Sequence, residues 1–489
     1  MSLLGIDLGT SGVKAGVFNL DGACMGQAYS EYDMLHPQPG WSELDSSNVW
    51  KITCDVIAEA VAKAGGDPVT ALSISSFGEA VVPVSKDRKI LDNSILCVDD
   101  RGQEHIDRLL ADFGHEAFYA INPNLLGPNY SMPKILWLKE HRPEVYEKAD
   151  LFLHWADFIG FMLGSDPATN NSHANRTLLF DLKKNDWSDE LIAWSGIDRD
   201  KLAPVVPGGT VTGTMSDAMA EQLGLPKGVK VVAGGHDQCC NTLGCGGVSA
   251  GRAVYGMGSF DCITPIYKMP ADIQQMRLSH LNVEHHLVPD LFVSFHYNQA
   301  GLLVKWFRDT FTDGSVSYAQ LDKEMPEDPS RLLVLPHFDT PPHHTPDTAG
   351  VIVGLRTSTQ RGEILKAIQE GTALYFLEGL DALNDLGLGA SEYIASGGGA
   401  RSDENLQLRA DILGVPVVRP VVTEAGLLGS AMNAGIATGV FQTSEDAAER
   451  CVRLDRRFEP NAERHAFYRE KHALYKQLQP SLMPVFQGL

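Results

Sequence analysis

The sequence predicts an α/β protein built from two related domains. Short runs rich in β-branched residues alternate with segments of helical periodicity, which is typical of α/β folds. The clearest strands lie at 71–75, 81–84 and 229–233, and the clearest helices lie at 48–64 and 362–383. A chain of 489 residues also exceeds what one hydrophobic core usually serves, and roughly 150 residues per domain gives two or three domains.

A glycine turn between two strands opens the chain. Its sequence is Asp7-Leu8-Gly9-Thr10-Ser11-Gly12, and apolar runs precede and follow it. Such a turn can bring backbone N–H groups, the Thr10 and Ser11 hydroxyls and the Lys14 ammonium group to a polyphosphate. Asp7, at the end of the first strand, can hold a hydrated metal ion. An ordinary hairpin with a tight glycine turn accounts for the same residues equally well.

The same strand, glycine turn and strand recur in the second half. The strand 252–255 leads into Gly256-Met257-Gly258-Ser259-Phe260 and then into a strand at 261–267. This unit follows the first by about 250 residues, which indicates a duplicated domain that begins with a phosphate-facing turn, although a chance echo is the alternative. With a duplication, the domains comprise residues 1–247 and 248–489, meet near 246–251, and hold a nucleotide in a cleft between them.

A third glycine cluster follows a short strand at 393–395. It reads Ser396-Gly397-Gly398-Gly399-Ala400 and precedes a helix predicted at 406–413, with the acceptors Ser402 and Asp403 before it. Glycines without side chains let a base or ribose approach the backbone. The cluster matches neither the dinucleotide G-x-G-x-x-G motif nor a P-loop, so a capped turn stays the alternative.

A carboxylate stands where a buried strand gives way to a helix. The strand 231–233 is followed by Gly234-Gly235-His236-Asp237-Gln238 and by a small-residue segment in which a helix starts. A carboxylate held at such a junction can accept a proton from a substrate hydroxyl, as phosphoryl transfer requires. Asp237 could instead be a helix N-cap. His236 is the weaker candidate for the base, since no second partner for its ring is evident.

Composition excludes several classes of partner. The chain has 62 acidic and 40 basic residues and a formal charge of −22, which disfavours binding to nucleic acid or to anionic lipid. Neither an export signal nor a membrane-spanning run is evident, so a cytoplasmic location is expected. The eight cysteines should be reduced, and the spacing of Cys239, Cys240, Cys245 and Cys262 matches no common zinc pattern, so no structural metal is expected.

Over essentially its whole length the chain resembles the FGGY carbohydrate kinases of the actin-like ATPase superfamily. The segments that carry the resemblance, in the expected order, are Gly5-Ile6-Asp7-Leu8-Gly9-Thr10, Pro133-Lys134-Ile135-Leu136-Trp137-Leu138, Gly234-Gly235-His236-Asp237, Gly350-Val351-Ile352-Val353-Gly354-Leu355, Ala367-Ile368-Gln369-Glu370-Gly371, Gly397-Gly398-Gly399-Ala400-Arg401-Ser402 and Glu424-Ala425-Gly426-Leu427-Leu428-Gly429-Ser430-Ala431. Each match is weak alone, but their common order leaves little room for coincidence.

The resemblance implies two ribonuclease-H-like domains around a deep central cleft, with sugar bound mainly by the first domain and ATP mainly by the second. It makes Asp237 the general base and Asp7 the residue that holds or positions Mg²⁺. Thr10, Ser11 and Lys14 would meet the terminal phosphates of ATP. Gly258 and Ser259 would contact phosphate from the other side, and Gly301, Lys305, Gly399 and Asp403 would border the adenosine.

The acceptor pocket departs from the family's patterns. Where xylulokinase-like members carry Met-His-Gly and glycerol kinases carry Arg-Glu, this chain has Gly78-Glu79, so the missing arginine is expected to leave room for a longer or differently oriented substrate. The remaining candidates for sugar contacts are Gln238, Phe260, Asp100, Arg101 and Tyr130, of which Gln238 and Phe260 follow the glycerol kinase pattern. Asp100 and Arg101 could line or support the pocket, or equally form a surface ion pair.

The sequence therefore predicts an ATP- and Mg²⁺-dependent kinase of a small sugar, with a pentulose as the first expectation. Glycerol, a tetritol or another polyol is the alternative, because Glu79, Gln238 and Phe260 suit a polyol. A nucleotide-gated interaction protein or a silent sugar sensor is the remote alternative. Whether the active form is a homodimer stays open.

Overall fold

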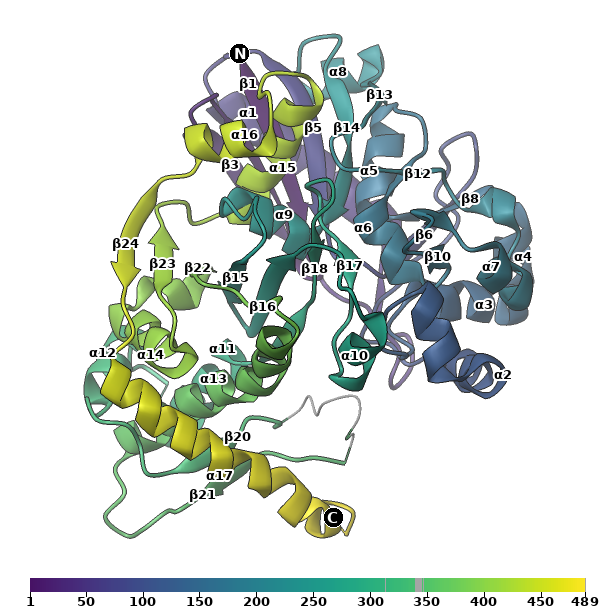
Figure 1. Ribbon diagram of the computed structural model, residues 1–489. Coiled ribbons are helices and arrows are strands. Elements are labelled where there is room, and N and C mark those ends of the chain that lie inside the picture. The colour runs from purple at the N-terminus through teal and green to yellow at the C-terminus, as the bar shows by residue number, and fades with distance from the viewer. Residues whose placement is uncertain (313, 339–344, 346, 489) are drawn as a thin grey trace. The chain divides into compact units, whose positions relative to one another are not determined.

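The computed structural model describes residues 1–312, 314–338, 345 and 347–488, and they fall into two compact units (Figure 1). The first unit comprises Met1–Val248, Lys268–Val293 and Glu424–Val452. The second comprises Ser249–Tyr267, Ser294–Thr423 and Arg453–Leu489. The chain first leaves the first unit after Val248, next to the predicted boundary, but each unit also takes in segments from the other half of the sequence.

A six-stranded mixed sheet forms the centre of the first unit. Its strand order is β13–β14–β5–β1–β2–β3. The bounds are Ser2–Leu8 for β1, Gly12–Phe18 for β2, Cys24–Glu31 for β3, Val69–Ser76 for β5, Val211–Thr214 for β13 and Lys230–His236 for β14. β1, β5 and β14 are parallel neighbours, and the other pairs are antiparallel. The predicted opening hairpin is β1 and β2.

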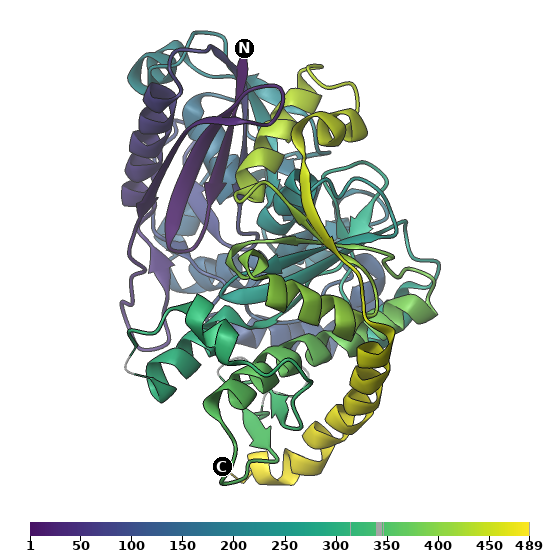
Figure 2. The same ribbon diagram turned by 90° about the vertical axis from the view of Figure 1, so that its left-hand side faces the viewer.

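Helices cover both faces of this sheet, as the side-chain alternation along β2 shows. Gly16 and its β1 partner Gly5 face α15 (Ala425–Ala437), since a Cβ on Gly5 would lie 2.0 Å from the Leu427 carbonyl oxygen. The next β2 residue, Val17, pairs with Gly26, which faces the backbone of α1 (Ser46–Lys63). Because successive strand residues point to opposite faces, α1 and α15 lie on opposite sides of the sheet (Figure 2).

The second unit contains a sheet of the same design. The whole sheet has eight strands, and six of them belong to this unit. In these six, β19 pairs with β16, and β15, β22, β23 and β24 follow β16 in that order. The bounds are Arg252–Met257 for β15, Phe260–Tyr267 for β16, His296–Gln299 for β19, Tyr393–Ser396 for β22, Val417–Pro420 for β23 and Leu454–Phe458 for β24. β15, β22 and β23 are parallel neighbours, and the remaining pairs are antiparallel.

The two sheets share one topology, which confirms the predicted relation between the halves. In each, three antiparallel strands are followed by two parallel strands and closed by an antiparallel edge strand, although β17 (Glu284–His285) and β18 (Phe292–Val293) come between β16 and β19 along the chain. The edge strands differ in one respect. β13 precedes its partner β14 in the chain, whereas β24 follows its partner β23. The turn between the first two strands therefore occupies the equivalent place in both units.

The principal helices of the second unit pack around its sheet. They are α11 (Gly301–Phe311), α12 (Tyr318–Glu324), α13 (Arg361–Asp385), α14 (Asp403–Leu413) and α17 (Ala462–Phe486). The predicted helices at 48–64 and 362–383 are α1 and α13. A capping box between Gln360 and Glu363 starts α13, which is the local reason that the helix begins there.

No helix in the described part of the chain is long and apolar enough to cross a membrane. The eight cysteines carry free thiols, and Cys239 and Cys240 are buried in the first unit. Burial raises the pKa of both thiols, which keeps them protonated at neutral pH.

Candidate active site

Asp237 is the first residue of α9 (Asp237–Gly244), directly after the buried strand β14. The glycines before it are required by packing, because a Cβ on Gly234 would lie 2.0 Å from the Ile74 carbonyl oxygen. The helix N-cap is His236, whose Nδ1 accepts the backbone N–H of Gln238 at 3.2 Å. The alternative prediction that Asp237 is the helix N-cap is therefore wrong.

A neutral imidazole adjoins the Asp237 carboxylate. His236 Nδ1 lies 3.2 Å from Asp237 Oδ1. Burial, followed by the nearby Arg176 charge, lowers the pKa of His236 well below its usual value, so the ring is neutral at pH 7. Because its Nδ1 already accepts a hydrogen bond, the contact with Asp237 is not an ion pair. His236 belongs to a column of rings that continues through His173 to His154.

Asp237 is poised to take up a proton near neutral pH. Burial, followed by the nearby carboxylates of Asp7 and Glu79, raises the pKa of its carboxyl to about 7, while hydrogen bonds from Gln238 act in the opposite direction. The side chain keeps 34% of its surface exposed, so a substrate hydroxyl can reach it. A carboxylate with a pKa close to the working pH suits general-base catalysis.

The first glycine turn holds an acid and a base next to each other. Asp7 on β1 pairs with Lys14 on β2 in the antiparallel register, and Lys14 Nζ donates to Glu424 Oε2 at 2.7 Å. Burial raises the pKa of Asp7, which the Lys14 charge opposes. The turn is anchored by Tyr32, whose hydroxyl donates to the carbonyl oxygens of Gly9 and Gly12. Thr10 is half-buried and Ser11 exposed, so both hydroxyls lie at the surface of the turn.

The surroundings of Asp7 fit a hard divalent cation. A Cβ on Gly426, in the first turn of α15, would lie 3.2 Å from Asp7 Oδ2, so glycine lets this helix start next to the carboxylate. Asp7 and Asp237 are close enough for each to disfavour ionisation of the other. Oxygen ligands from one or two carboxylates, completed by phosphate oxygens and water, are what Mg²⁺ usually takes in nucleotide enzymes.

Glu79 belongs to a buried ion-pair cluster. Arg176, in the 3₁₀ turn η1 (Asn175–Thr177), donates from Nε to Glu79 Oε1 at 2.9 Å and from a terminal nitrogen to Glu284 Oε1 at 2.9 Å. Glu284 lies in the short strand β17 (Glu284–His285). The guanidinium also stacks over the buried ring of Tyr130, 4.7 Å from the ring centre. Glu79 and Tyr130, both predicted sugar contacts, thus meet at one arginine.

The expectation that Gly78 leaves room for a longer substrate is wrong. A Cβ on Gly78 would lie 2.3 Å from His236 Cδ2 and 3.1 Å from Arg176 Cγ. The space beside Gly78 is thus filled by those two side chains. The glycerol kinase pattern has an arginine directly before the glutamate, and this chain has Gly78 there. Arg176, which is distant in sequence, instead provides the guanidinium that hydrogen-bonds to Glu79.

Arg101 supports the fold of this region and does not pair with Asp100. Its side chain is 5% exposed and donates to Asp99 from Nε at 2.9 Å and to Glu43 Oε1 at 2.8 Å. The rings of Trp41 and Trp137 also lie against the guanidinium. The alternative of a surface Asp100–Arg101 pair is therefore wrong. Arg101 pairs with Asp99 instead, and this pair is buried, whereas Asp100 is exposed.

The predicted nucleotide residues of the second unit gather at the β15–β16 turn. The backbone N–H of Gly301, at the start of α11, donates to the Gly258 carbonyl oxygen at 3.1 Å, and a Cβ on Gly301 would lie 2.3 Å from the same oxygen. Gly397 has a φ of +86°, and a Cβ there would lie 2.5 Å from the Met257 carbonyl oxygen. A Cβ on Gly399 would lie 2.9 Å from Met257 Cβ. Three glycine segments therefore converge beside Ser259.

The remaining predicted residues of this unit lie around that turn or on the helices next to it. Phe260 begins β16 and is 40% exposed. Lys305 is exposed, one turn of α11 after Gly301. Asp403 begins α14, and its carboxylate accepts from Arg419 at 2.6 Å and from Arg456. The Asp403 carboxylate is thus held in place by two arginines.

Comparison with known proteins identifies the family of the chain. The N-terminal domain of the FGGY family of carbohydrate kinases matches residues 2–244, and the C-terminal domain of that family matches residues 267–438. The chain belongs to the FGGY family of carbohydrate kinases. It is an ATP-dependent kinase with the two-domain α/β fold that the resemblance implied.

Relatives of known activity align over nearly the whole chain. Xylulose kinase of Bacillus subtilis (strain 168) is 28% identical and covers 97% of this chain and 96% of its own length. Autoinducer-2 kinase of Escherichia coli (strain K12) is also 28% identical, with 96% and 92% covered. The crystal structure of xylulose kinase from Rhodospirillum rubrum superposes with a TM-score of 0.89 at 25% identity and covers all of both chains.

Proposed function

We propose that this FGGY kinase phosphorylates a pentulose and that Asp237 is its general base. The observation that carries the proposal is the Asp237 carboxyl, which is fixed at the first position of α9, is partly exposed, and has a pKa of about 7. A group that binds and releases its proton near neutral pH can accept the hydroxyl proton as the sugar oxygen attacks phosphorus.

In the proposed step, the sugar hydroxyl gives its proton to an Asp237 carboxylate oxygen. The hydroxyl oxygen forms a bond to the terminal phosphorus of ATP, and the bond from that phosphorus to the bridging oxygen breaks, which releases ADP. His236 does not compete for the proton, because its ring is neutral and its Nδ1 already accepts the backbone N–H of Gln238.

Glu79 is the proposed anchor for the sugar. Its carboxylate can accept two hydroxyls, and the hydrogen bonds from Arg176 fix its orientation. Tyr130, through its stack on Arg176, and Gln238, next to Asp237, complete the proposed polar contacts in the first unit. Arg101 supports this region through Asp99 and does not itself offer a free guanidinium to the sugar.

On the phosphate side, we assign the turn of the first unit to the terminal phosphates. Lys14, Thr10 and Ser11 supply a cation and hydroxyls, and Asp7 would hold Mg²⁺ directly or through water. When bound, Mg²⁺ offsets the negative charge of the transferring phosphoryl group. In the second unit, the converging glycine segments at Gly258, Gly301 and Gly399 let the nucleotide approach the backbone, with Ser259, Lys305 and Asp403 around it.

A polyol such as glycerol or a tetritol is the second candidate. In the first unit, Gln238 offers an amide that suits a short polyol, and the Glu79–Arg176 pair supplies a carboxylate with an arginine beside it. One relative, from Escherichia coli, is named autoinducer-2 kinase, so autoinducer-2 is a further acceptor to test.

Release of ADP over a panel of acceptors tests the assignment. The panel holds the epimeric pentuloses, hexuloses, glycerol, tetritols and autoinducer-2, each at matched concentration with ATP and Mg²⁺. We expect a pentulose to give a kcat/KM at least about tenfold above every other class, which corresponds to about 1.4 kcal/mol of transition-state preference. A polyol or autoinducer-2 that exceeded all pentuloses would overturn the pentulose assignment and leave the kinase assignment standing.

A further inference from the structure

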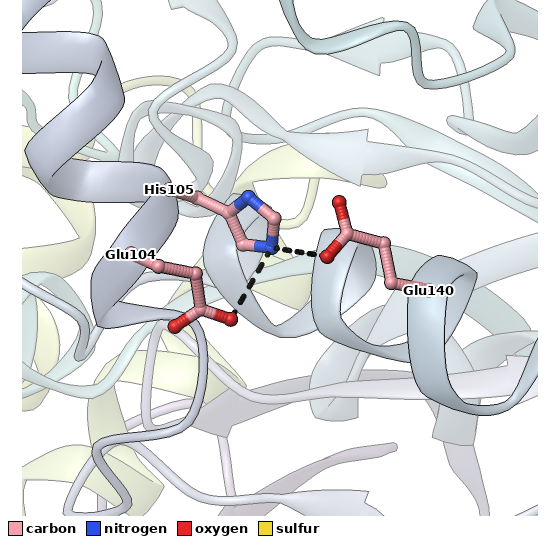
Figure 3. Close-up of side chains that lie close together, drawn as sticks. All are labelled: Glu104, His105 and Glu140. Carbon is pink, nitrogen blue, oxygen red and sulfur yellow. Dashed lines mark ion pairs between the residues drawn. The ribbon is translucent and has the colours of Figure 1, made fainter.

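Outside the proposed active site, two helices of the first unit bring an imidazole and two carboxylates together (Figure 3). Glu104 and His105 lie in the first turn of α2 (Gln103–Ile121), and Glu140 lies in the last turn of α3 (Ser131–His141). His105 Nε2 is 3.7 Å from Glu104 Oε1 and 3.7 Å from Glu140 Oε2. Among the described residues, this is the group whose three ligand atoms all lie within 4.8 Å of one another.

His105 has a buried ring nitrogen that makes no hydrogen bond in the described part of the chain. The residue is 2% exposed, and its Nε2 makes no hydrogen bond within the described chain. Figure 3 shows this nitrogen pointing to the space between the two carboxylates. A buried polar atom without a hydrogen bond is costly, and a bound ion is one of the ways in which native proteins satisfy such an atom.

The chemistry of the three side chains suits a metal ion. An imidazole can donate a lone pair from Nε2 to a metal ion, and carboxylates supply oxygen ligands. Both glutamates are about half exposed, so their carboxylates can adjust to an ion.

The separation of the three groups leaves space for an ion. His105 Nε2 and the Glu140 carboxylate oxygen are 3.7 Å apart. For an ion about 2.1 Å from each of them, the ligand–ion–ligand angle would be about 120°, near the tetrahedral value of Zn²⁺ sites. One imidazole and two carboxylates are ligands of Zn²⁺ and similar divalent transition-metal ions, whereas Mg²⁺ and Ca²⁺ prefer oxygen alone.

We propose that Glu104, His105 and Glu140 bind one divalent transition-metal ion of the Zn²⁺ class, with water completing its coordination. The nearby basic side chains of Arg108 and His141 make contacts elsewhere. The Arg108 guanidinium lies over the Trp194 ring, and the His141 ring stacks on Trp137 with its Nδ1 3.1 Å from the Trp137 carbonyl oxygen. The ion joins the start of α2, just after Arg101, to the end of α3, which begins next to Tyr130.

Titration of the tag-free, full-length protein with Zn²⁺ alone tests the site. The protein is first treated with a chelator, and the calorimetric titration is run in excess Mg²⁺, which occupies oxygen-only sites such as Asp7. Wild type and the control variant Glu147→Gln, which alters an exposed glutamate on α4 (Pro143–Lys148), should bind one equivalent with equal affinity. Glu140→Gln and His105→Gln should lose at least about tenfold in affinity.

Glu140→Gln is the decisive variant, because its side chain is half exposed and the substitution should not disturb folding. Equal affinity in Glu140→Gln and Glu147→Gln would overturn the proposal, as would the absence of a stoichiometric site in the wild type. X-ray absorption at the zinc edge gives an independent answer. We expect only nitrogen and oxygen ligands at about 2.0–2.1 Å, whereas a sulfur ligand at about 2.3 Å would assign the zinc to a cysteine and refute the site.

Discussion

Arg176 Nε donates a hydrogen bond to Glu79 Oε1 at 2.9 Å, although 97 residues separate the two in the sequence. The same guanidinium also bonds Glu284, 108 residues later, so one side chain fixes two buried carboxylates. A planar guanidinium holds both at once, which a lysine ammonium cannot do with the same geometry. Glu79, the proposed sugar anchor, therefore depends on Arg176, and the sequence around Arg176 contains no motif that would predict this role.

Replacing Arg176 with lysine should weaken sugar use more than ATP use. The ammonium keeps the charge but loses the paired hydrogen bonds that orient Glu79. We expect kcat/KM for the sugar to fall about tenfold to hundredfold, about 1.4–2.8 kcal/mol, with KM for ATP unchanged. Arg199→Lys, at a part-exposed arginine, is the matched control. An equal loss for sugar and ATP would contradict a specific role in the sugar site.

Acidification should remove activity as Asp237 becomes protonated. Its pKa is about 7 in the free enzyme, and only the ionised carboxylate can accept the proton. The logarithm of kcat/KM for the sugar should fall with unit slope below about pH 7 and level off above it. Initial rates measured from pH 5 to pH 9 at constant ionic strength check this. A profile that stayed flat down to about pH 5 would contradict the assignment.

The same raised pKa predicts that Asp237→Asn stabilises the protein at alkaline pH. A carboxyl whose pKa is higher in the folded than in the unfolded state binds more protons when folded, so its ionisation costs stability as pH rises through the window from 3.8 to about 7. Asparagine removes that cost. The melting temperature of the variant should exceed that of wild type at pH 8, and the gap should shrink towards pH 4. A variant that melts lower than wild type at pH 8 would refute this account.

Gly78→Ala should impair the site although it adds only a methyl group. The new Cβ would lie 2.3 Å from His236 Cδ2, and moving that ring disturbs both the α9 cap and its contact with Asp237. We expect a loss of about 1–3 kcal/mol in the free energy of unfolding and a lower kcat. Denaturant unfolding and steady-state kinetics measure the two effects. Gly160→Ala, whose nearest neighbours lie at 3.4 Å or beyond, should change neither.

The sequence allowed the reaction class, the two related units and the strand-to-helix position of Asp237 to be predicted, because each rests on a local pattern. Strand, glycine turn and strand can be recognised within twenty residues, and their recurrence anticipated two sheets of one topology. The order of β13 and β14 at the sheet edge carries no such local signal. Edge strands are placed by tertiary packing rather than by their own residues.

The acceptor pocket was less predictable because long-range contacts build it. Nothing near Arg176 signals that its side chain reaches Glu79 and Glu284, and the glycine at position 78 suggested open space where His236 is packed. For Arg101, the adjacent Asp100 was the obvious partner, but a turn presents Asp99 instead. His236 as the α9 cap could have been suspected, since a side chain before the first helical residue often caps it.

The turnover of Asp237→Asn tests the central claim most directly. The variant keeps the shape of the side chain but cannot take a proton, so we predict a loss of about a hundred- to ten-thousand-fold in kcat with ATP and the best acceptor of the panel. Binding of that acceptor, measured by calorimetry, should change little, which separates lost chemistry from lost folding. A variant with near wild-type kcat would contradict the assignment of Asp237 as the general base.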